Sequence, residues 1–197
     1  MTPDSCILFP HIRLVMVWFV AFLLGLASLV QAQEASPPAQ GASPPEQINP
    51  PFGLFWAERQ SEINLVLERA GAKVISKEVQ QGREAWTVTG LIQPALKRTV
   101  LYFGVDKTLV EVELQYEHPE WDLPAYEAFF NSARKQLESR YGIPTVLARD
   151  KATQGDVMQT VVGYRWQQAG SSIELFFYSA ERNTDVYRTV SLHYRAG

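Results

Sequence analysis

The sequence predicts an α+β protein in which two helix-plus-antiparallel-strand units form one two-layer domain of sheet and helices. Two segments, residues 63–70 and 122–141, carry apolar side chains at helical spacing. Each is followed by several segments in which apolar and polar residues alternate, as in half-buried strands. Because these strands follow one another through short turns, we expect the sheet to be antiparallel.

The best-specified element is the helix over residues 122–141. Asp122 is a good N-cap, because its carboxylate can accept from the free N–H groups of the first turn. Gly142 suits the left-handed C-cap, and Pro144 prevents continuation of the helix. One apolar stripe is predicted to pack on the sheet, and it consists of Tyr126, Phe130, Ala133, Leu137 and Tyr141.

Seven strands are predicted from alternation and from apolar runs. The last strand of the first unit is the clearest, because Val110, Val112 and Leu114 alternate with Glu111 and Glu113, which we expect to face water. A turn is expected at residues 170–172, before the sixth strand. The predicted strands are residues 74–79, 83–89, 99–105, 110–117, 158–166, 173–179 and 190–195.

Two short matches suggest that the units are a tandem repeat. Residues 99–103 resemble residues 173–177, and residues 112–116 resemble residues 190–194, in the same order after a helix. The units would then span residues 52–118 and 119–197.

The N-terminus has the layout of a secretory signal peptide over residues 1–32. An apolar run follows Arg13, and Val30 and Ala32 precede the expected cleavage point. The alternative is an uncleaved membrane anchor, because the run approaches the length of a spanning helix. Residues 33–51 form a Pro/Ala/Ser-rich linker, and a single α+β domain is expected over residues 52–197.

Composition argues against several classes of function. The formal net charge is −3 at pH 7, and basic residues form no long run, so we expect no nucleic-acid partner. The single cysteine, Cys6, precedes the apolar run, so the exported chain would have no disulfide and no thiolate. No nucleotide-binding, nucleophile-elbow or zinc motif is present, and we expect no cofactor and no metal.

Two groups of residues are candidates for a site. His118, Glu120 and Asp122 form the one titratable cluster, which is the weaker candidate for metal binding or acid–base chemistry because Asp122 is engaged as an N-cap. Phe176 and Tyr178 are the candidate interface, since they lie on the strand face opposite Leu175 and Phe177. His193, on the last strand, is expected to be exposed.

Phe52-Gly53-Leu54 leads into the first helix, and Arg140-Tyr141-Gly142-Ile143-Pro144 ends the second. This layout resembles that of uncharacterised exported bacterial α/β proteins. The helix-plus-meander unit, used twice over residues 52–194, is similar to the β-lactamase-inhibitor-protein and BamE-like folds. This sequence departs from them in having one helix per unit. The resemblance implies a binding or assembly role in the envelope and assigns no site residue.

The signal peptide layout, the lack of catalytic motifs and the role that the resemblance implies lead us to expect an exported, non-catalytic binding or assembly protein of the bacterial envelope, located in the periplasm or at the cell surface. Its expected partner is an envelope protein or a second copy of the chain. The alternatives are a small envelope enzyme that uses the His118 loop, and a carrier of apolar ligands with a pocket between sheet and helices. Contact with a membrane is expected only if the apolar N-terminal segment stays uncleaved.

Overall fold

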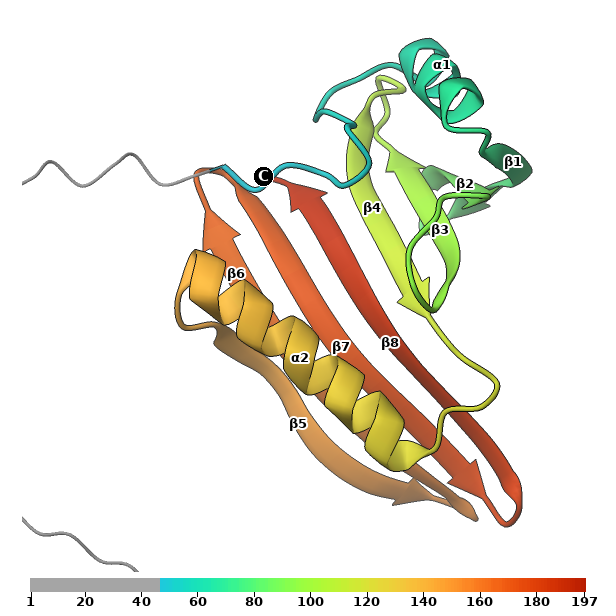
Figure 1. Ribbon diagram of the computed structural model, residues 1–197, viewed down its shortest axis with the longest axis vertical. Helices are drawn as coiled ribbons and strands as arrows, with labels where there is room; N and C mark the ends of the chain where they lie inside the picture. Colours follow the sequence, from blue (N-terminus) through green and yellow to red (C-terminus); the bar gives the residue numbers. More distant parts are fainter. Residues whose placement is uncertain (1–46) are drawn as a thin grey trace, which may run out of the picture. The chain divides into compact units, whose positions relative to one another are not determined.

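The computed structural model describes residues 47–197, which form two α-helices and eight β-strands (Figure 1). The predicted signal peptide and residues 33–46 of the predicted linker lie outside the described residues. The α+β class predicted from the sequence is confirmed in this broad sense. The elements are α1 (Gln60–Arg69), β1 (Lys73–Gln80), β2 (Arg83–Thr89), β3 (Leu96–Phe103), β4 (Leu109–Tyr116), α2 (Leu123–Tyr141), β5 (Thr145–Gln154), β6 (Val157–Gln168), β7 (Ser171–Arg182) and β8 (Asp185–Ala196).

All eight strands belong to one antiparallel sheet with the order β1-β2-β3-β4-β8-β7-β6-β5. Strands β1 to β4 form one meander and β5 to β8 form a second. The two meanders meet where their last strands, β4 and β8, pair with each other. Strands β1 and β5 are therefore the two edges of the sheet.

Helix α2 begins and ends where its capping residues predict. The Asp122 carboxylate accepts a hydrogen bond from the Ala125 N–H at 2.9 Å. Gly142 follows the last turn with a positive φ of 82°, a conformation that glycine adopts without steric cost. Tyr126 and Phe130 of the predicted stripe are buried, and the rest of it, Ala133, Leu137 and Tyr141, is partly buried against the core.

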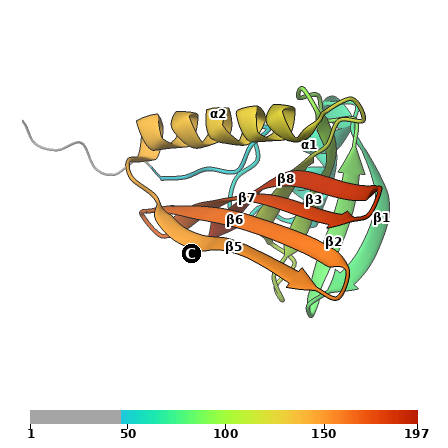
Figure 2. The same ribbon diagram turned by 90° about the horizontal axis from the view of Figure 1, so that it is seen from below.

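The main core lies on the sheet face that α2 covers. Helix α2 lies over β5–β8 on one side of the sheet (Figure 2), and the Phe130 ring lies 5.9 Å from that of Tyr164 and 6.0 Å from that of Phe177. Helix α1 adds Ile63 and Leu67 to the same apolar cluster. Burial of these side chains away from water is the main force holding helices to sheet.

The second meander differs from the prediction in two places. Strand β5, an edge strand that is mostly exposed, was not among the predicted strands. The turn before β7 consists of Ala169 and Gly170, whose φ values are 40° and 79°. Ser171 and Ser172 are thus the first residues of β7 and not part of the turn.

The prediction for β4 is wrong in two respects. Tyr102 pairs with Glu111 and Phe103 with Leu109, so Val110 is bulged out of the ladder and packs on the face opposite Leu109. The acidic residues Glu111 and Glu113 are 3% and 8% exposed, although they were expected to face water. Both acids lie on the face of the sheet that α2 does not cover, which we call the helix-free face.

The packed part of the chain includes Ile48, which precedes the domain boundary predicted at residue 52. Ile48 is fully buried, and its N–H donates to the Ser171 hydroxyl at 3.0 Å. The Trp56 indole in turn donates to the Ile48 carbonyl at 2.8 Å. Within residues 47–197, neither helix is long and apolar enough to cross a membrane.

Candidate functional site

The candidate interface residues Phe176 and Tyr178 lie on the helix-free face of the sheet. Their neighbours Leu175 and Phe177 belong to the core beneath α2, whereas Phe176 and Tyr178 are partly exposed. The sequence predicted this division, because residues alternate between the two faces along a strand.

Neighbouring strands partly cover both rings. Phe176 lies over Gly163 of β6, where an added Cβ would come within 2.5 Å of the ring. The same ring lies edge-on to His193 of β8, with ring centroids 5.7 Å apart. Tyr178 lies 6.0 Å from the ring of Tyr187, which is 48% exposed. Phe176 and Tyr178 are therefore partly packed residues, while Tyr187 is the more accessible ring of this surface.

Beside these rings, a row of alternating charges runs across the sheet from β2 to β6, with one residue on each of these strands except β3. Arg83 pairs with Glu111 at 2.7 Å, and Arg195 contacts both Glu111 at 3.3 Å and Glu174 at 2.8 Å. Arg165 donates to Glu174 from Nε at 2.7 Å. We call this set, Arg83, Glu111, Arg195, Glu174 and Arg165, the charge row.

The charge row is layered by depth. The side chains of Glu111 and Glu174 are 4% and 3% exposed, whereas those of Arg83, Arg195 and Arg165 are 32%, 38% and 41% exposed. The carboxylates are thus buried beneath guanidinium groups, which pair with them. The guanidinium groups are therefore the part of the charge row that is exposed to water and to any partner.

Hydrogen bonding decides the protonation state of Glu111, the buried acid that lies between Arg83 and Arg195 in the row. Burial alone would raise the pKa of Glu111, but hydrogen bonds from His193 and Arg83 and the charge of Arg195 lower it to about 2. His193 lies 3.1 Å from Glu111 through Nδ1 and is only 17% exposed, so its expected exposure is wrong. Nearby, burial and a hydrogen bond to Glu113 raise the pKa of Tyr102.

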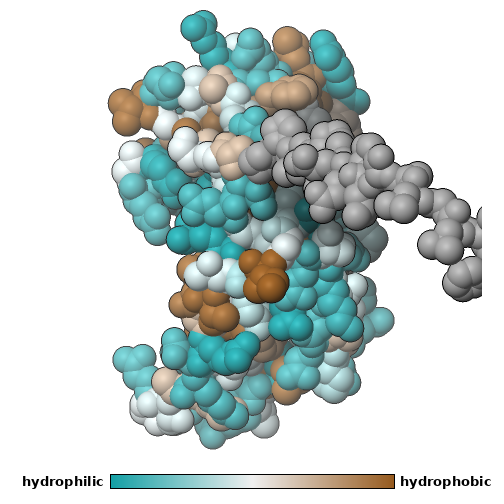
Figure 3. Space-filling view, turned by 90° about the vertical axis from the view of Figure 1, so that its left-hand side faces the viewer, coloured by the Kyte–Doolittle hydropathy of each residue, from teal (hydrophilic) through white to brown (hydrophobic). Residues whose placement is uncertain are grey.

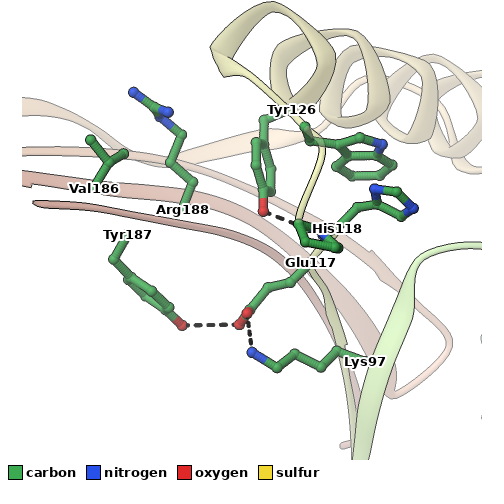
Figure 4. A pocket seen from close by; sticks show the side chains of 9 residues that line it. Lys97, Glu117, His118, Tyr126, Val186, Tyr187 and Arg188 are labelled. Carbon is green, nitrogen blue, oxygen red and sulfur yellow. Dashed lines mark hydrogen bonds and ion pairs between the residues drawn. The ribbon is translucent and has the colours of Figure 1, made fainter. Parts of the chain in front are cut away.

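The second candidate region, around His118, lines a hollow of about 540 Å³. Figure 4 shows the hydroxyl of Tyr187 and the side chain of Lys97 meeting at Glu117 on one side, with Tyr126 near His118 on another. Arg188, from β8, is held by Glu181 at 2.6 Å. The hollow is lined by Lys97, Glu117, His118, Pro119, Trp121, Tyr126, Val186, Tyr187 and Arg188.

The predicted titratable cluster does not converge on one point. Asp122 caps α2, as predicted. His118 accepts a hydrogen bond from the Glu120 N–H at Nδ1, over 3.3 Å, and its ring stacks on Trp121 at 5.7 Å. Glu120 and Asp122 are exposed. Within the described residues, no group of three His, Cys, Asp or Glu side chains is arranged to hold a metal ion.

A third hollow, of about 420 Å³, lies beside α2 and is mostly apolar. Its walls include Phe129 and Leu137 of α2 and Leu192 and Tyr194 of β8. Burial raises the pKa of Tyr194 to about 12, so its hydroxyl stays protonated and can donate. This hollow lies between helix and sheet, where an apolar ligand was expected.

The exposed apolar residues do not add a further surface on the side seen in Figure 3. There, hydrophobic residues form separate small groups among polar ones. Isolated exposed apolar residues are normal on a soluble protein. The helix-free face differs from them because it also carries the guanidinium layer of the charge row.

The residues that the sequence analysis missed are the members of the charge row. Alternation placed Glu111 and Glu113 on the correct face but carried no sign that they are buried. Arg195, which covers Glu111, is 84 residues away from it in the chain. Comparison of the chain with protein-family models, with curated proteins and with solved structures gave no match.

Proposed function

We propose that the protein is an exported, non-catalytic binding or assembly protein of the bacterial envelope that uses the helix-free face of its sheet. The observation that carries this proposal is that one sheet face carries the partly exposed Tyr178, the exposed Tyr187 and an outward guanidinium layer. Tyrosine and arginine are the residues most enriched in protein interfaces, and they often supply most of the binding energy. Export and the location in the periplasm or at the cell surface rest on the sequence of residues 1–32.

The chemistry of the face favours a partner protein over a second copy of the chain. Arg83, Arg165 and Arg195 lie over their carboxylates, so two copies placed face to face would bring guanidinium against guanidinium. A partner that presents acidic and apolar side chains would complement both the guanidinium layer and the tyrosines.

The test is capture of the partner from an envelope extract by the purified protein and by two variants. Tyr178→Ser removes an accessible ring, and Arg165→Gln removes a guanidinium, without emptying the core beneath α2. We expect both to lose the captured protein. Tyr178→Ser should keep the thermal midpoint of the wild type, whereas Arg165→Gln should lower it, because buried Glu174 then loses one of its two guanidinium partners. Higher salt should release the partner, because the contact with the cationic layer is electrostatic.

Val79→Ser is the matched control. Val79 is 78% exposed on the edge strand β1, so the change also replaces an exposed apolar side chain by serine, away from the face. Equal capture by all four proteins would contradict the proposal. Sedimentation of the wild type as a dimer that Tyr178→Ser converts to monomer would identify the occupant as a second copy instead.

A second candidate function is that of an apolar-ligand carrier, and the hollow beside α2 favours it. Apolar walls with a few polar groups are typical of small-molecule sites, and the Tyr194 hydroxyl would supply such a group. Native mass spectrometry of the purified protein would detect a retained ligand. Loss of that mass in Leu137→Arg, which would fill the hollow with a charge, would locate the ligand there.

We also infer that the domain is a tandem repeat of two helix-plus-meander units that share one two-layer structure. Each unit has the order helix and then four strands. Further support comes from the pairs Val112–Tyr194, Leu114–Leu192 and Tyr116–Val190. If each residue of 112–116 is replaced by its equivalent in 190–194 and the reverse, the same three pairs result. Two related units that pair about a two-fold axis would show this symmetry.

The match between the third strands needs a different register. Thr99 pairs with Leu114 in the first unit, and Leu175 pairs with Leu192 in the second. If Leu114 and Leu192 are equivalent, Thr99 corresponds to Leu175, two residues beyond the position that the sequence match assigns.

A further inference from the structure

Two arginines converge on one buried phenol on the side of α2 that faces β5. Arg134 of α2 donates to the Tyr164 hydroxyl at 3.3 Å, and Arg149 of β5 donates to it at 3.0 Å. Tyr164 belongs to β6 and is 5% exposed. The guanidinium of Arg134 also lies 5.4 Å from the centre of the Tyr164 ring. A helix, an edge strand and an inner strand thus bring two positive charges to one oxygen atom.

These arginines are paired with carboxylates less closely than the arginines of the charge row are. Arg134 Nε forms an ion pair with Glu138 at 3.6 Å, which is too long for a hydrogen bond, and this buried nitrogen has no hydrogen-bond partner in the described part of the chain. Within residues 47–197, Arg149 forms no ion pair with a carboxylate, and it is exposed. By contrast, Arg83, Arg165 and Arg195 each contact a buried glutamate.

The cluster therefore has an excess of donors over acceptors. Each guanidinium carries five N–H groups, and the Tyr164 oxygen is the acceptor that they share. Since that oxygen accepts from both arginines, the hydroxyl hydrogen of Tyr164 points elsewhere and remains able to donate. A ligand that completes this cluster must supply acceptors and negative charge.

The ionisation of Tyr164 is consistent with a positive local field. Burial would raise the pKa of its phenol, but hydrogen bonds from Arg149 and Arg134 and the charges of the two arginines lower it. No glutamate offsets this field as closely as Glu111 and Glu174 do in the charge row.

We propose that Arg134, Arg149 and Tyr164 form a binding site for an oxyanion, a phosphate or carboxylate group, between α2 and β5. Arginine is suited to this role because its planar fork matches the oxygen atoms of either group. Access is open on the β5 side, where Arg149 is exposed, and Arg134 is 31% exposed. The site lies on the helix side of the sheet and is independent of the partner surface proposed above.

The experiment is a nuclear magnetic resonance titration of the purified protein with ring-labelled tyrosine, in which Tyr164→Phe identifies the Tyr164 signal. Inorganic phosphate and acetate are added separately, with chloride at matched ionic strength as the reference. We expect a saturable shift of the Tyr164 signal with phosphate, acetate or both, and the two titrations distinguish the phosphate from the carboxylate. Bound anion should also raise the pKa of Tyr164, because it offsets the two guanidinium charges.

Arg149→Gln removes one guanidinium and should weaken binding about tenfold, as expected for loss of a charge-assisted hydrogen bond. Arg149→Lys keeps the charge but loses the fork, so it should also weaken binding if the contact is bidentate. Arg182→Gln, an exposed arginine on the tip of β7, is the matched control and should bind as the wild type does.

A Tyr164 signal that moves equally with chloride, or that moves without saturation, would show ionic screening alone and would overturn the proposal. Equal affinity in the wild type and in Arg149→Gln would overturn it as well. Partner capture through the helix-free face is unaffected by either result, so the two proposals fail separately.

Discussion

At the scale of single residues, the buried acid Glu111 has the largest consequence for stability. Its pKa of about 2 in the folded protein lies below its ordinary value of 4.5. A carboxylate whose folded pKa is depressed adds stability above its unfolded pKa, and this stability is lost as the pH falls toward the folded pKa. The contribution of Glu111 is on the order of 3 kcal/mol at neutral pH.

We therefore expect the stability difference between the wild type and Glu111→Gln to shrink between pH 5 and about pH 2. Urea unfolding at a series of pH values measures this difference. Glu120→Gln, which changes an exposed glutamate, is the control and should change stability little at any of these pH values. A Glu111→Gln difference that is constant with pH would mean that the pKa of Glu111 is the same in the folded and in the unfolded protein.

Residue identity alone could not predict this burial. The alternation of β4 correctly separated Val112 and Leu114 from Glu111 and Glu113. Whether an alternating acid faces water or lies beneath arginines depends on side chains that arrive from distant strands. Asp122 is the opposite case, because its cap partner, Ala125, is three residues away and the sequence was sufficient.

At the scale of elements, local signals predicted α2 well and β5 not at all. Helix α2 has its own caps and its own apolar stripe. Strand β5 has one neighbouring strand, and most of its residues are exposed, so it lacks the alternation that identifies a strand with one buried face. Strand β5 is formed by its pairing with β6, and the sequence of β5 alone does not predict that pairing.

The graded burial of the α2 stripe makes a prediction about its energetics. Phe130 is 6% exposed, whereas Leu137 is partly buried and lines the hollow beside the helix. Phe130→Ala should cost about 3–5 kcal/mol, as core phenylalanine truncations do, and Leu137→Ala about 1–2 kcal/mol. Chemical unfolding of the two variants measures both costs. Equal costs would mean that Leu137 is as well packed as Phe130 and that the hollow closes in solution.

At the scale of the whole molecule, the pairing of β4 with β8 is the feature that no local pattern could supply. The predicted meanders were present in the sequence, but nothing in either one specified which strand would join them. The partners Leu114 and Leu192 are far apart in the chain, and both are buried where the meanders meet. The charge row crosses this same junction, since Glu111 is on β4 and Arg195 on β8.

Because one apolar cluster and one charge row cross the junction, we expect the two meanders to unfold together. Leu192→Ala should lower the opening free energy of amides in β2–β4 and in β6–β8 by the same amount, about 2–4 kcal/mol. Native-state hydrogen exchange read by mass spectrometry measures each strand separately. Val79→Ala, on the exposed edge of β1, is the control and should leave both groups unchanged. Lost protection confined to β6–β8 would contradict the expectation, because the first meander would then be stable without the second.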